Sequence, residues 1–305
     1  MRIAIVGIGG VGGYFGGKLA REYENSNQHE IIFIARGEHL KAIQKNGLQL
    51  FTREGDYIAR PRLATDNPSE AGVFDLVFFC VKSYHLESSA QKFRDCINKN
   101  TIVIPLLNGV NIVERLHAVL AQANFLSGSV YIISHIEKPG VIHQEDGACK
   151  LIFGTDDQES AQKYSYILNI LLKAKINAIL TDKISEALWT KYLLMCPLAS
   201  LMSATGKTYG DIWADSSLRK KARDMMLEVA AVAKARHIFL PENAVDKAME
   251  MVAGFGHNSK TSMQLDRENG RQTEIDALTA YLCNAGSESG VPTPLHNEIY
   301  FQLNR

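Results

Sequence analysis

Residues 1–12 impose the tightest constraint on what this chain can fold into. An apolar run, Ile3–Val6, leads directly into a G-x-G-x-x-G pattern that opens a helical segment. In such a setting the first glycine permits a tight turn, the second lets the backbone approach a pyrophosphate, and the third lets the helix pack closely on the strand. The helix N-terminus also favours the phosphate charge. We therefore predict a dinucleotide-binding loop, the alternative being a glycine-rich turn without a ligand. The loop consists of Gly7, Ile8, Gly9, Gly10, Val11 and Gly12.

Short apolar runs alternate with helical patterns through the first half of the chain. The predicted strands are Ile3–Val6, Ile31–Ala35, Leu76–Val81 and Thr101–Pro105. The predicted helices between them are Val11–Glu22, Glu38–Asn46, His85–Phe93 and Val110–Leu120. Strands that are apolar at consecutive positions are typical of a parallel sheet covered on both faces. The alternation predicts an α/β fold with a doubly wound, Rossmann-type sheet.

Further β-rich segments interrupt and follow this alternation. Leu48–Phe51 and Tyr57–Arg60 predict a hairpin. Later strands are predicted at Leu126–Ser134, Val141–His143 and Leu151–Phe153, with turns at Pro139–Gly140 and Asp146–Gly147. From about Thr181 onward the pattern is helical, which predicts a second, all-helical domain.

The charge balance and the cysteines exclude several classes of function. The 305 residues carry 33 basic and 33 acidic side chains, so we expect no nucleic acid and no anionic membrane as partner. The five cysteines form no C-x-x-C pair, and we predict no metal site. Scattered cysteines in a chain of this length are typical of the reducing cytosol, so a cytoplasmic location is expected. The apolar runs are far shorter than the ~18 residues of a membrane span.

The end of the second predicted strand bears on the choice of cofactor. A site for NAD(H) usually has an acidic residue here to bind the ribose 2′-hydroxyl, but this chain has Ala35 followed by Arg36. A carboxylate would repel a 2′-phosphate, whereas a guanidinium pairs with it. We therefore predict NADP(H) as the cofactor, with Arg36 at its 2′-phosphate. The alternative is that Arg36 is a solvated residue at a strand end.

Two more polar residues follow predicted strands. Lys82 follows Leu76–Val81, and Asn108 follows the strand at Thr101–Pro105 and its apolar extension. Residues just past strand C-termini face the ligand crevice of an open α/β sheet. The spacing leaves two interpretations open for each residue: it contacts a ligand, or it is a helix cap or a solvated loop residue.

A lysine falls on the apolar side of the next helix. Asp182–Ser200 predicts an amphipathic helix whose stripe also carries Lys191. One interpretation places its stem along the surface and its ammonium group in water. The other places Lys191 in an interdomain cleft, where desolvation would lower its pKa and make it a better proton donor. The predicted stripe consists of Ile184, Ala187, Leu188, Met195 and Ala199.

The stretch 257–276 has the pattern of a capped surface helix. Thr261 and Gln264 fit a capping box, and a charged helical run follows over Arg267–Asp276. Within that run Arg271 and Glu274 are three residues apart, a spacing that allows an ion pair on an exposed face.

Together these motifs resemble the ketopantoate reductase (2-dehydropantoate 2-reductase) family over essentially the whole chain. The block T-S-M-x-x-D…T-E-I-D, at this distance from W-x-K, is the most specific part of the resemblance. The matching segments are Gly7–Gly12, Ala35–Gly37, Val81–Tyr84, Leu107–Val110, Trp189–Tyr192, Thr261–Asp266, Thr273–Asp276 and Gly290–Pro294.

The resemblance implies a fold and a set of cofactor contacts. The implied fold is a Rossmann NADPH domain followed by a helical domain like that of 6-phosphogluconate dehydrogenase, with a substrate cleft between them. Arg36 would hold the 2′-phosphate, and Lys82 would lie nearby. Ser134 is implied as a backbone contact to the cofactor. We place the boundary near 180, which gives an NADP-binding domain at 1–180 and a helical substrate and catalytic domain at 181–305.

The resemblance also implies roles in catalysis. Lys191 would donate a proton to the ketone oxygen of a 2-oxo acid. Glu274 would bind near the nicotinamide ribose and orient the lysine. Asn108 would contact both cofactor and substrate, and Ser262 would hold the substrate carboxylate.

The chain departs from the family at two of the implied substrate-binding positions. Members that reduce ketopantoate usually carry asparagines four and eight residues after the catalytic lysine, where this chain has Met195 and Ala199. Loss of side chains that hydrogen-bond a substrate hydroxyl weakens selection for that hydroxyl.

Three functions remain open on these grounds. The first is NADPH-dependent reduction of 2-dehydropantoate to pantoate in pantothenate biosynthesis. The second is NADPH-dependent reduction of a different, less polar 2-oxo acid. The third, a non-catalytic NADPH-sensing protein, is disfavoured because Lys191, Ser262 and Glu274 are all present. The expected partner is a small 2-oxo acid, and a homodimer is left open.

Overall fold

The computed structural model describes residues 1–145 and 148–304, so the predicted turn at Asp146–Gly147 lies outside the described residues. The chain forms two compact units. Unit 1 comprises Met1–Leu107 and Asn111–Ile184, and unit 2 comprises Asn108–Val110 and Ser185–Arg305.

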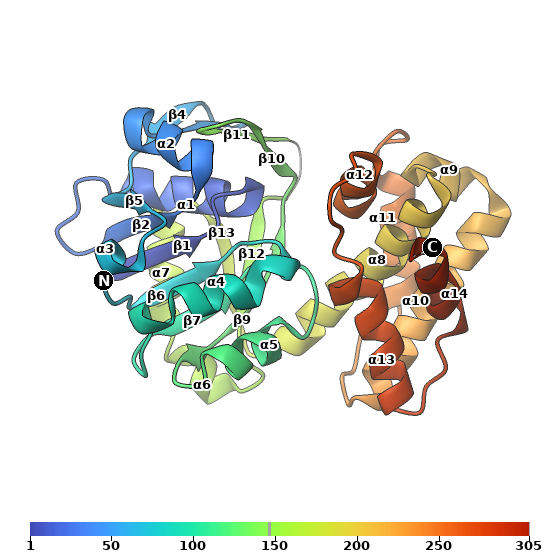
Figure 1. Cartoon of the computed structure of the whole chain (residues 1–305). Coiled ribbons are helices and arrows are strands. Elements are labelled where there is room, and N and C mark those ends of the chain that lie inside the picture. The colour runs from blue at the N-terminus through green and yellow to red at the C-terminus, as the bar shows by residue number, and fades with distance from the viewer. Residues whose placement is uncertain (146–147, 305) are drawn as a thin grey trace. The chain divides into compact units, whose positions relative to one another are not determined.

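Unit 1 is built on a parallel sheet of six strands in the order β5-β2-β1-β6-β7-β8 (Figure 1). The chain runs outward from β1 to β2 and β5, and then from β6 to β7 and β8, so its direction reverses between β1 and β6. Ligands bind at such a switch point in open α/β sheets. The strands are β1 (Arg2–Val6), β2 (Glu30–Ile34), β5 (Leu63–Thr65), β6 (Leu76–Phe79), β7 (Ile102–Pro105) and β8 (Asn124–Phe125).

The consecutive apolar residues of these strands supply two separate cores. In β1, Ile3 and Ile5 enter one core, whereas Ala4 and Val6 enter the other. Successive side chains of a strand point to opposite faces, so a sheet covered on both faces needs apolar residues at every position. The helices of unit 1 are α1 (Gly10–Glu22), α2 (Gly37–Asn46), α3 (Pro68–Ala71), α4 (Leu86–Lys92), α5 (Ile112–Val119), α6 (Gln158–Gln162) and α7 (Ser165–Lys173), with single 3₁₀ turns η1 (Ser83–His85) and η2 (Arg94–Cys96).

Two smaller mixed sheets complete unit 1. The first, in the order β10-β11-β3-β4, packs on α1. It contains the predicted hairpin, β3 (Leu48–Phe51) and β4 (Tyr57–Ala59), with β10 (Ser134–Lys138) and β11 (Val141–Gln144). The second, in the order β13-β12-β9, consists of β9 (Ser127–Tyr131), β12 (Lys150–Gly154) and β13 (Asn177–Thr181).

Unit 2 is helical among its described residues. A core that includes side chains from α8, α10, α11 and α14 fills its interior. Its helices are α8 (Ile184–Thr205, which begins at the last residue of unit 1), α9 (Tyr209–Ala214), α10 (Ser216–Ala235), α11 (Ala244–Gly254), α12 (Ser262–Glu268), α13 (Tyr281–Glu288) and α14 (Pro294–Leu303), with a π-helical turn η3 (Asp276–Ala280).

The structure confirms the predicted fold class, a parallel Rossmann-type sheet followed by a helical region. Strands β5 and β13 are among those that were not predicted. β5 has only three residues, and β13 alternates between exposed and buried positions at its start, so neither carries a long apolar run. Across the described part of the chain, no helix is long and apolar enough to cross a membrane.

Candidate functional site

The glycine loop is closely packed at Gly7, Gly10 and Gly12 and open at Gly9. A Cβ placed on Gly10 would lie 2.1 Å from the carbonyl oxygen of Ser134, and one on Gly12 would lie 2.0 Å from that of Gly7. Among the described residues, no atom apart from those of its chain neighbours lies within 4 Å of the equivalent position on Gly9. The third glycine of the motif thus lets α1 pack on the turn, while the second leaves its surroundings open. This arrangement fits the phosphates of a dinucleotide.

Ser134 lies directly beside this loop. It begins β10, and its hydroxyl oxygen is buried without a hydrogen-bond partner among the described residues. A buried hydroxyl group normally has a partner, so this group is available to a ligand at the loop. The family resemblance implied a cofactor contact at Ser134, and the structure brings this residue next to Gly10.

Arg36 and Lys82 follow the two strands that flank β1. Arg36 follows β2 and takes the N-cap position of α2, and Lys82 follows β6 and precedes η1. The guanidinium group of Arg36 lies 3.0 Å from the Nε2 atom of His85. His85 was not predicted as a site residue. Its one sequence signal is its position three residues after Lys82, beyond a strand that borders β1.

In unit 2, three of the predicted site residues are hydrogen-bonded together. Lys191 Nζ donates to Asn108 Oδ1 at 3.1 Å, and Asn108 Nδ2 donates to Glu274 Oε2 at 3.5 Å. These residues come from the segment after β7, from α8 and from the segment before η3. The amide of Asn108 thus accepts from the lysine and donates to the carboxylate.

The surroundings of Lys191 change its acidity. Burial lowers the pKa of Lys191 to about 8, and the Glu274 carboxylate opposes this shift because it favours the ammonium form. The lysine therefore remains mostly in its ammonium form at neutral pH but releases its proton far more readily than a lysine in water. Such a group is suited to proton transfer.

The expected surface ion pair between Arg271 and Glu274 is wrong. Glu274 is only 5% exposed, and Arg271 pairs with Asp266 at 2.9 Å. The expected helical run over Arg267–Asp276 is also wrong. Helix α12 ends at Glu268, and the chain then turns at Gly270, which has a positive φ. A charged run has the pattern of a solvated helix, and only the tertiary fold buries one of its carboxylates.

The capping box expected in this stretch forms only in half. Thr261 accepts a hydrogen bond from the Gln264 backbone at 3.2 Å, as an N-cap does. The Gln264 side chain, however, donates to Glu268 at 3.1 Å. Ser262 is the first residue of α12, and its side chain is exposed. Ser262 is not part of the hydrogen-bonded trio of Asn108, Lys191 and Glu274.

The predicted apolar stripe of α8 is wrong in part. Ala187, Leu188 and Met195 are only half-buried, whereas Trp189 and Tyr192 are in the core of unit 2. After Lys191 the helix is buried on several sides, so a single amphipathic stripe does not describe it. Of the two predicted substrate-binding residues on this helix, Met195 lies at the edge of the core of unit 2 and Ala199 lies within that core.

A π-helical turn supports this region and was not predicted. Tyr192 of α8 donates its hydroxyl hydrogen to the Leu278 carbonyl in η3 at 2.5 Å. The hydroxyl groups of Ser200 and Thr279 are 2.7 Å apart. These contacts hold the turn that follows Glu274 against the helix that carries the lysine. No local sequence pattern indicates a π-helical turn, which is frequent at functional sites.

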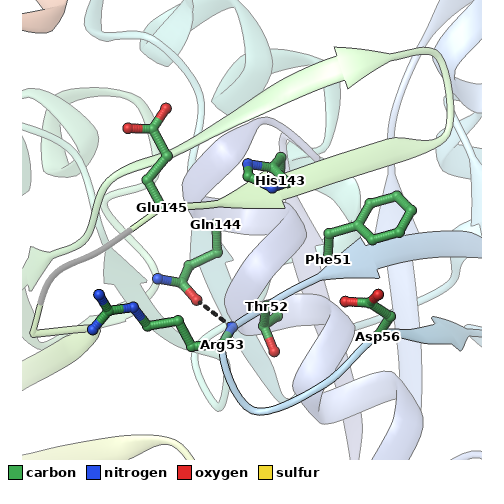
Figure 2. Close-up of a pocket in the computed structure, with 7 residues that line it drawn as sticks. All are labelled: Phe51, Thr52, Arg53, Asp56, His143, Gln144 and Glu145. Carbon is green, nitrogen blue, oxygen red and sulfur yellow. Dashed lines mark hydrogen bonds between the residues drawn. The ribbon is translucent and has the colours of Figure 1, made fainter.

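A separate open pocket lies on the sheet that contains the hairpin (Figure 2). Gln144 Oε1 accepts a hydrogen bond from the Arg53 backbone there at 3.3 Å. The predicted site residues are not among those that line it. The lining residues are Phe51, Thr52, Arg53, Asp56, His143, Gln144 and Glu145. No cluster of three or more metal-ligating side chains occurs in the residues that the structure describes.

Comparison with known proteins identifies the family. Residues 3–158 match the family described as Ketopantoate reductase PanE/ApbA, and residues 183–305 match its C-terminal family. This chain belongs to the ketopantoate reductase PanE/ApbA family. It is therefore a nicotinamide-dependent oxidoreductase that acts on a small molecule.

Individual relatives span the whole chain. A 2-dehydropantoate 2-reductase from Mesorhizobium japonicum is 29% identical over 100% of this chain and 97% of its own length. An uncharacterized oxidoreductase, YkpB, from Bacillus subtilis is 26% identical over 99% of this chain and 98% of its own.

Solved structures show the same fold. The crystal structure of a family member from Ralstonia eutropha is 30% identical, covers 100% of this chain and 97% of its own, and has a TM-score of 0.88. A D-mandelate dehydrogenase, solved with NADH and anilino(oxo)acetate, is 24% identical. It covers 100% of this chain and 97% of its own, with a TM-score of 0.86.

Proposed function

We propose that this protein catalyses the NADPH-dependent reduction of 2-dehydropantoate to pantoate, a step of pantothenate biosynthesis. The observation that carries the proposal is the hydrogen-bonded trio of Asn108, Lys191 and Glu274, in which the lysine has a lowered pKa. Reduction of a ketone requires a proton at its oxygen, and a lysine with a pKa of about 8 can supply it.

The cofactor-binding role is proposed for residues 1–180. The Gly7–Gly12 loop would hold the pyrophosphate, and Arg36 would hold the 2′-phosphate. Ser134 would make a backbone contact to the cofactor beside the loop. Lys82 would lie nearby, after the strand on the opposite side of β1. When bound, the cofactor supplies the hydride. The preference for NADP(H) rests on Arg36, because no carboxylate occupies the strand end where the 2′-phosphate would lie.

The catalytic and substrate-binding role is proposed for residues 181–305 together with Asn108. Lys191 stabilises the negative charge that develops on the carbonyl oxygen and delivers the proton. Glu274 acts on the lysine by favouring its ammonium form, which is the form that donates. Asn108 holds the lysine side chain in place, and Ser262 would hold the substrate carboxylate.

A second candidate substrate is a less polar 2-oxo acid. Met195 and Ala199 are the observation that favours it, because a weakly accepting thioether and a methyl group replace the amides that would hydrogen-bond the hydroxyl group of 2-dehydropantoate. A site without such a partner discriminates weakly for a hydroxyl. Aryl 2-oxo acids also belong in a test, because a D-mandelate dehydrogenase shares the fold.

A turnover screen tests the proposal. The kcat/KM values for 2-dehydropantoate, 2-oxoisovalerate (the same branched acid without the hydroxymethyl group) and phenylglyoxylate would be measured with NADPH. The proposal expects the highest value for 2-dehydropantoate. A higher value for either of the other acids would favour the second candidate. Binding of NADPH without turnover on any 2-oxo acid would contradict both and favour an NADPH sensor.

We also propose that the protein is a cytoplasmic homodimer. A dimeric ketopantoate reductase from Staphylococcus aureus shares the fold, with a TM-score of 0.79 and 20% identity. Light scattering coupled to gel filtration would measure the mass in solution, and the mass of a single 33.8 kDa chain would contradict the dimer.

A further inference from the structure

Two basic side chains meet near the switch point of the unit 1 sheet. Arg36 follows β2 and His85 ends η1 after β6, and β1 lies between these two strands. Arg36 Nη2 nevertheless lies 3.0 Å from His85 Nε2. The contact therefore lies beyond the carboxyl ends of the strands, where the glycine loop also begins.

The contact fixes the protonation state of His85 in the structure. A guanidinium group can only donate, so Nε2 must accept and the ring proton must lie on Nδ1. A protonated imidazole would face the guanidinium with a second positive charge. Consistent with this, burial lowers the pKa of His85, and the charge of Arg36 lowers it further.

None of the other described contacts of His85 brings a carboxylate to its ring. The Tyr84 ring lies edge-on at 4.7 Å, and the His85 backbone donates to the carbonyl of Lys82. Glu87, on the adjoining helix α4, is engaged by Arg115 of α5 at 2.6 Å. Burial is thus the larger cause of the lowered pKa of His85, and Arg36 is the charged group that lowers it further.

We propose that His85 is a second, protonatable group of the 2′-phosphate site at Arg36, so that NADPH binding takes up a proton from solvent. This inference rests on the proposed preference for NADP(H). A phosphate dianion beside Arg36 replaces the local positive charge with a negative one and offers oxygen acceptors. The incoming proton goes to Nε2, the atom that accepts from the guanidinium in the structure. His85 then becomes a second cationic donor to the phosphate.

The sign of the pH dependence follows from linkage. The pKa of His85 is lowered in the free protein and, on this proposal, raised in the complex. NADPH affinity therefore increases as the pH falls from the pKa of His85 in the complex to its pKa in the free protein. The total increase is about tenfold for each pH unit between these two pKa values. Protonation of the 2′-phosphate itself, with a pKa of about 6, acts in the opposite direction, so the measurement belongs above that pH.

Binding titrations with two cofactors test the proposal. NADPH and NADH would be titrated calorimetrically between about pH 6.5 and about pH 8.5, each in two buffers of different ionisation enthalpy, to obtain affinity and proton uptake. NADH is the matched control, because it lacks the 2′-phosphate. We expect the NADPH-to-NADH affinity ratio to fall several-fold as the pH rises across this range, with proton uptake for NADPH alone.

His85→Gln supplies the matched variant. Glutamine retains hydrogen-bonding capacity but does not titrate, so the ratio should no longer change with pH and the uptake should disappear. His85→Asn, with a shorter side chain, guards against a folding defect in the first variant. A pH-independent ratio in the wild type, or an unchanged slope in both variants, would overturn the role of His85. Equal affinity for NADH and NADPH at every pH would overturn the NADP(H) preference instead.

Discussion

At the scale of single residues, the chemistry proposed for this protein depends on one ammonium group. The environment of Lys191 combines burial, which lowers its pKa, with a nearby carboxylate, which raises it. The two effects oppose each other, so the lysine keeps a proton that it can also release. A lysine in water would hold its proton too tightly to be an efficient acid near neutral pH.

Substitution of Lys191 should separate binding from turnover. We expect Lys191→Ala to lower kcat by about 10²- to 10⁴-fold, because general acid catalysis contributes that much, while NADPH affinity changes little. Lys183→Ala is the matched control, because Lys183 is exposed just before α8. Steady-state kinetics and a cofactor titration measure both effects. Near-wild-type kcat in Lys191→Ala would show that another group supplies the proton.

The pH profile should report the same group. The ammonium form donates, and the pKa of Lys191 is about 8, so kcat/KM for the 2-oxo acid at saturating NADPH should decrease as the pH rises through that value. Glu274→Gln removes the carboxylate that raises this pKa, and the decrease should therefore begin at lower pH. An alkaline limb at the same pH in wild type and variant would contradict the coupling between the two residues.

At the scale of elements, the turn from β1 into α1 combines tight packing with open space. Gly10 faces the Ser134 carbonyl at a distance that no Cβ could tolerate, whereas Gly9 has open surroundings. The packing requirement and the ligand-binding requirement thus fall on adjacent residues. Each can be tested by adding a single methyl group.

The two alanine variants of this turn should have different effects, one on stability and the other on cofactor binding. Gly10→Ala should lower the free energy of unfolding by about 1–3 kcal/mol or more, because the added methyl group overlaps a backbone oxygen. Gly9→Ala should leave the Tm nearly unchanged but weaken NADPH binding, since its methyl group occupies the space proposed for the pyrophosphate. Thermal melts and cofactor titrations distinguish the two effects. Equal loss of stability in both variants would refute the assignment of separate roles.

The π-helical turn makes a second element-scale prediction. Tyr192→Phe removes the hydroxyl donor to the Leu278 carbonyl, which keeps the Tyr281 backbone N–H as a partner. Loss of the hydroxyl hydrogen bond should therefore cost about 0.5–1.5 kcal/mol of stability. Tyr166→Phe, at an exposed tyrosine, is the matched control and should change stability little. Denaturant unfolding measures both. If the two variants are equally stable, the tyrosine hydroxyl does not hold the turn.

At the scale of the whole molecule, the two units have separate cores, and the proposal assigns the cofactor-binding residues mainly to unit 1. Hydrogen exchange should therefore slow on NADPH addition at the backbone of the Gly7–Gly12 loop and of Ser83–His85. Exchange in the middle of α10, which contributes to the core of unit 2, should stay nearly unchanged. Protection confined to α10 would contradict the assignment of the cofactor to unit 1.

Much of the fold was predictable because its signals are local. Strands buried on both faces need apolar residues at consecutive positions, so β1, β2, β6 and β7 stand out in the sequence. The glycine motif marks the turn after β1, and the helical second half has its own composition. The positions of Arg36 and Lys82 just after strands were also predictable, because residues that follow parallel strands gather at one edge of the sheet.

The sequence by itself determined the fold class and the kinds of side chain available for chemistry, because helix periodicity, strand patterning and turn residues act over a few neighbouring positions. Only the tertiary structure decided which of these side chains meet. Glu274 is 166 positions from Asn108, and His85 is 49 positions from Arg36, yet each pair is in contact. Contacts at such separations depend on how whole elements pack, so a charged run that looks solvated can contain a carboxylate that raises the pKa of the lysine.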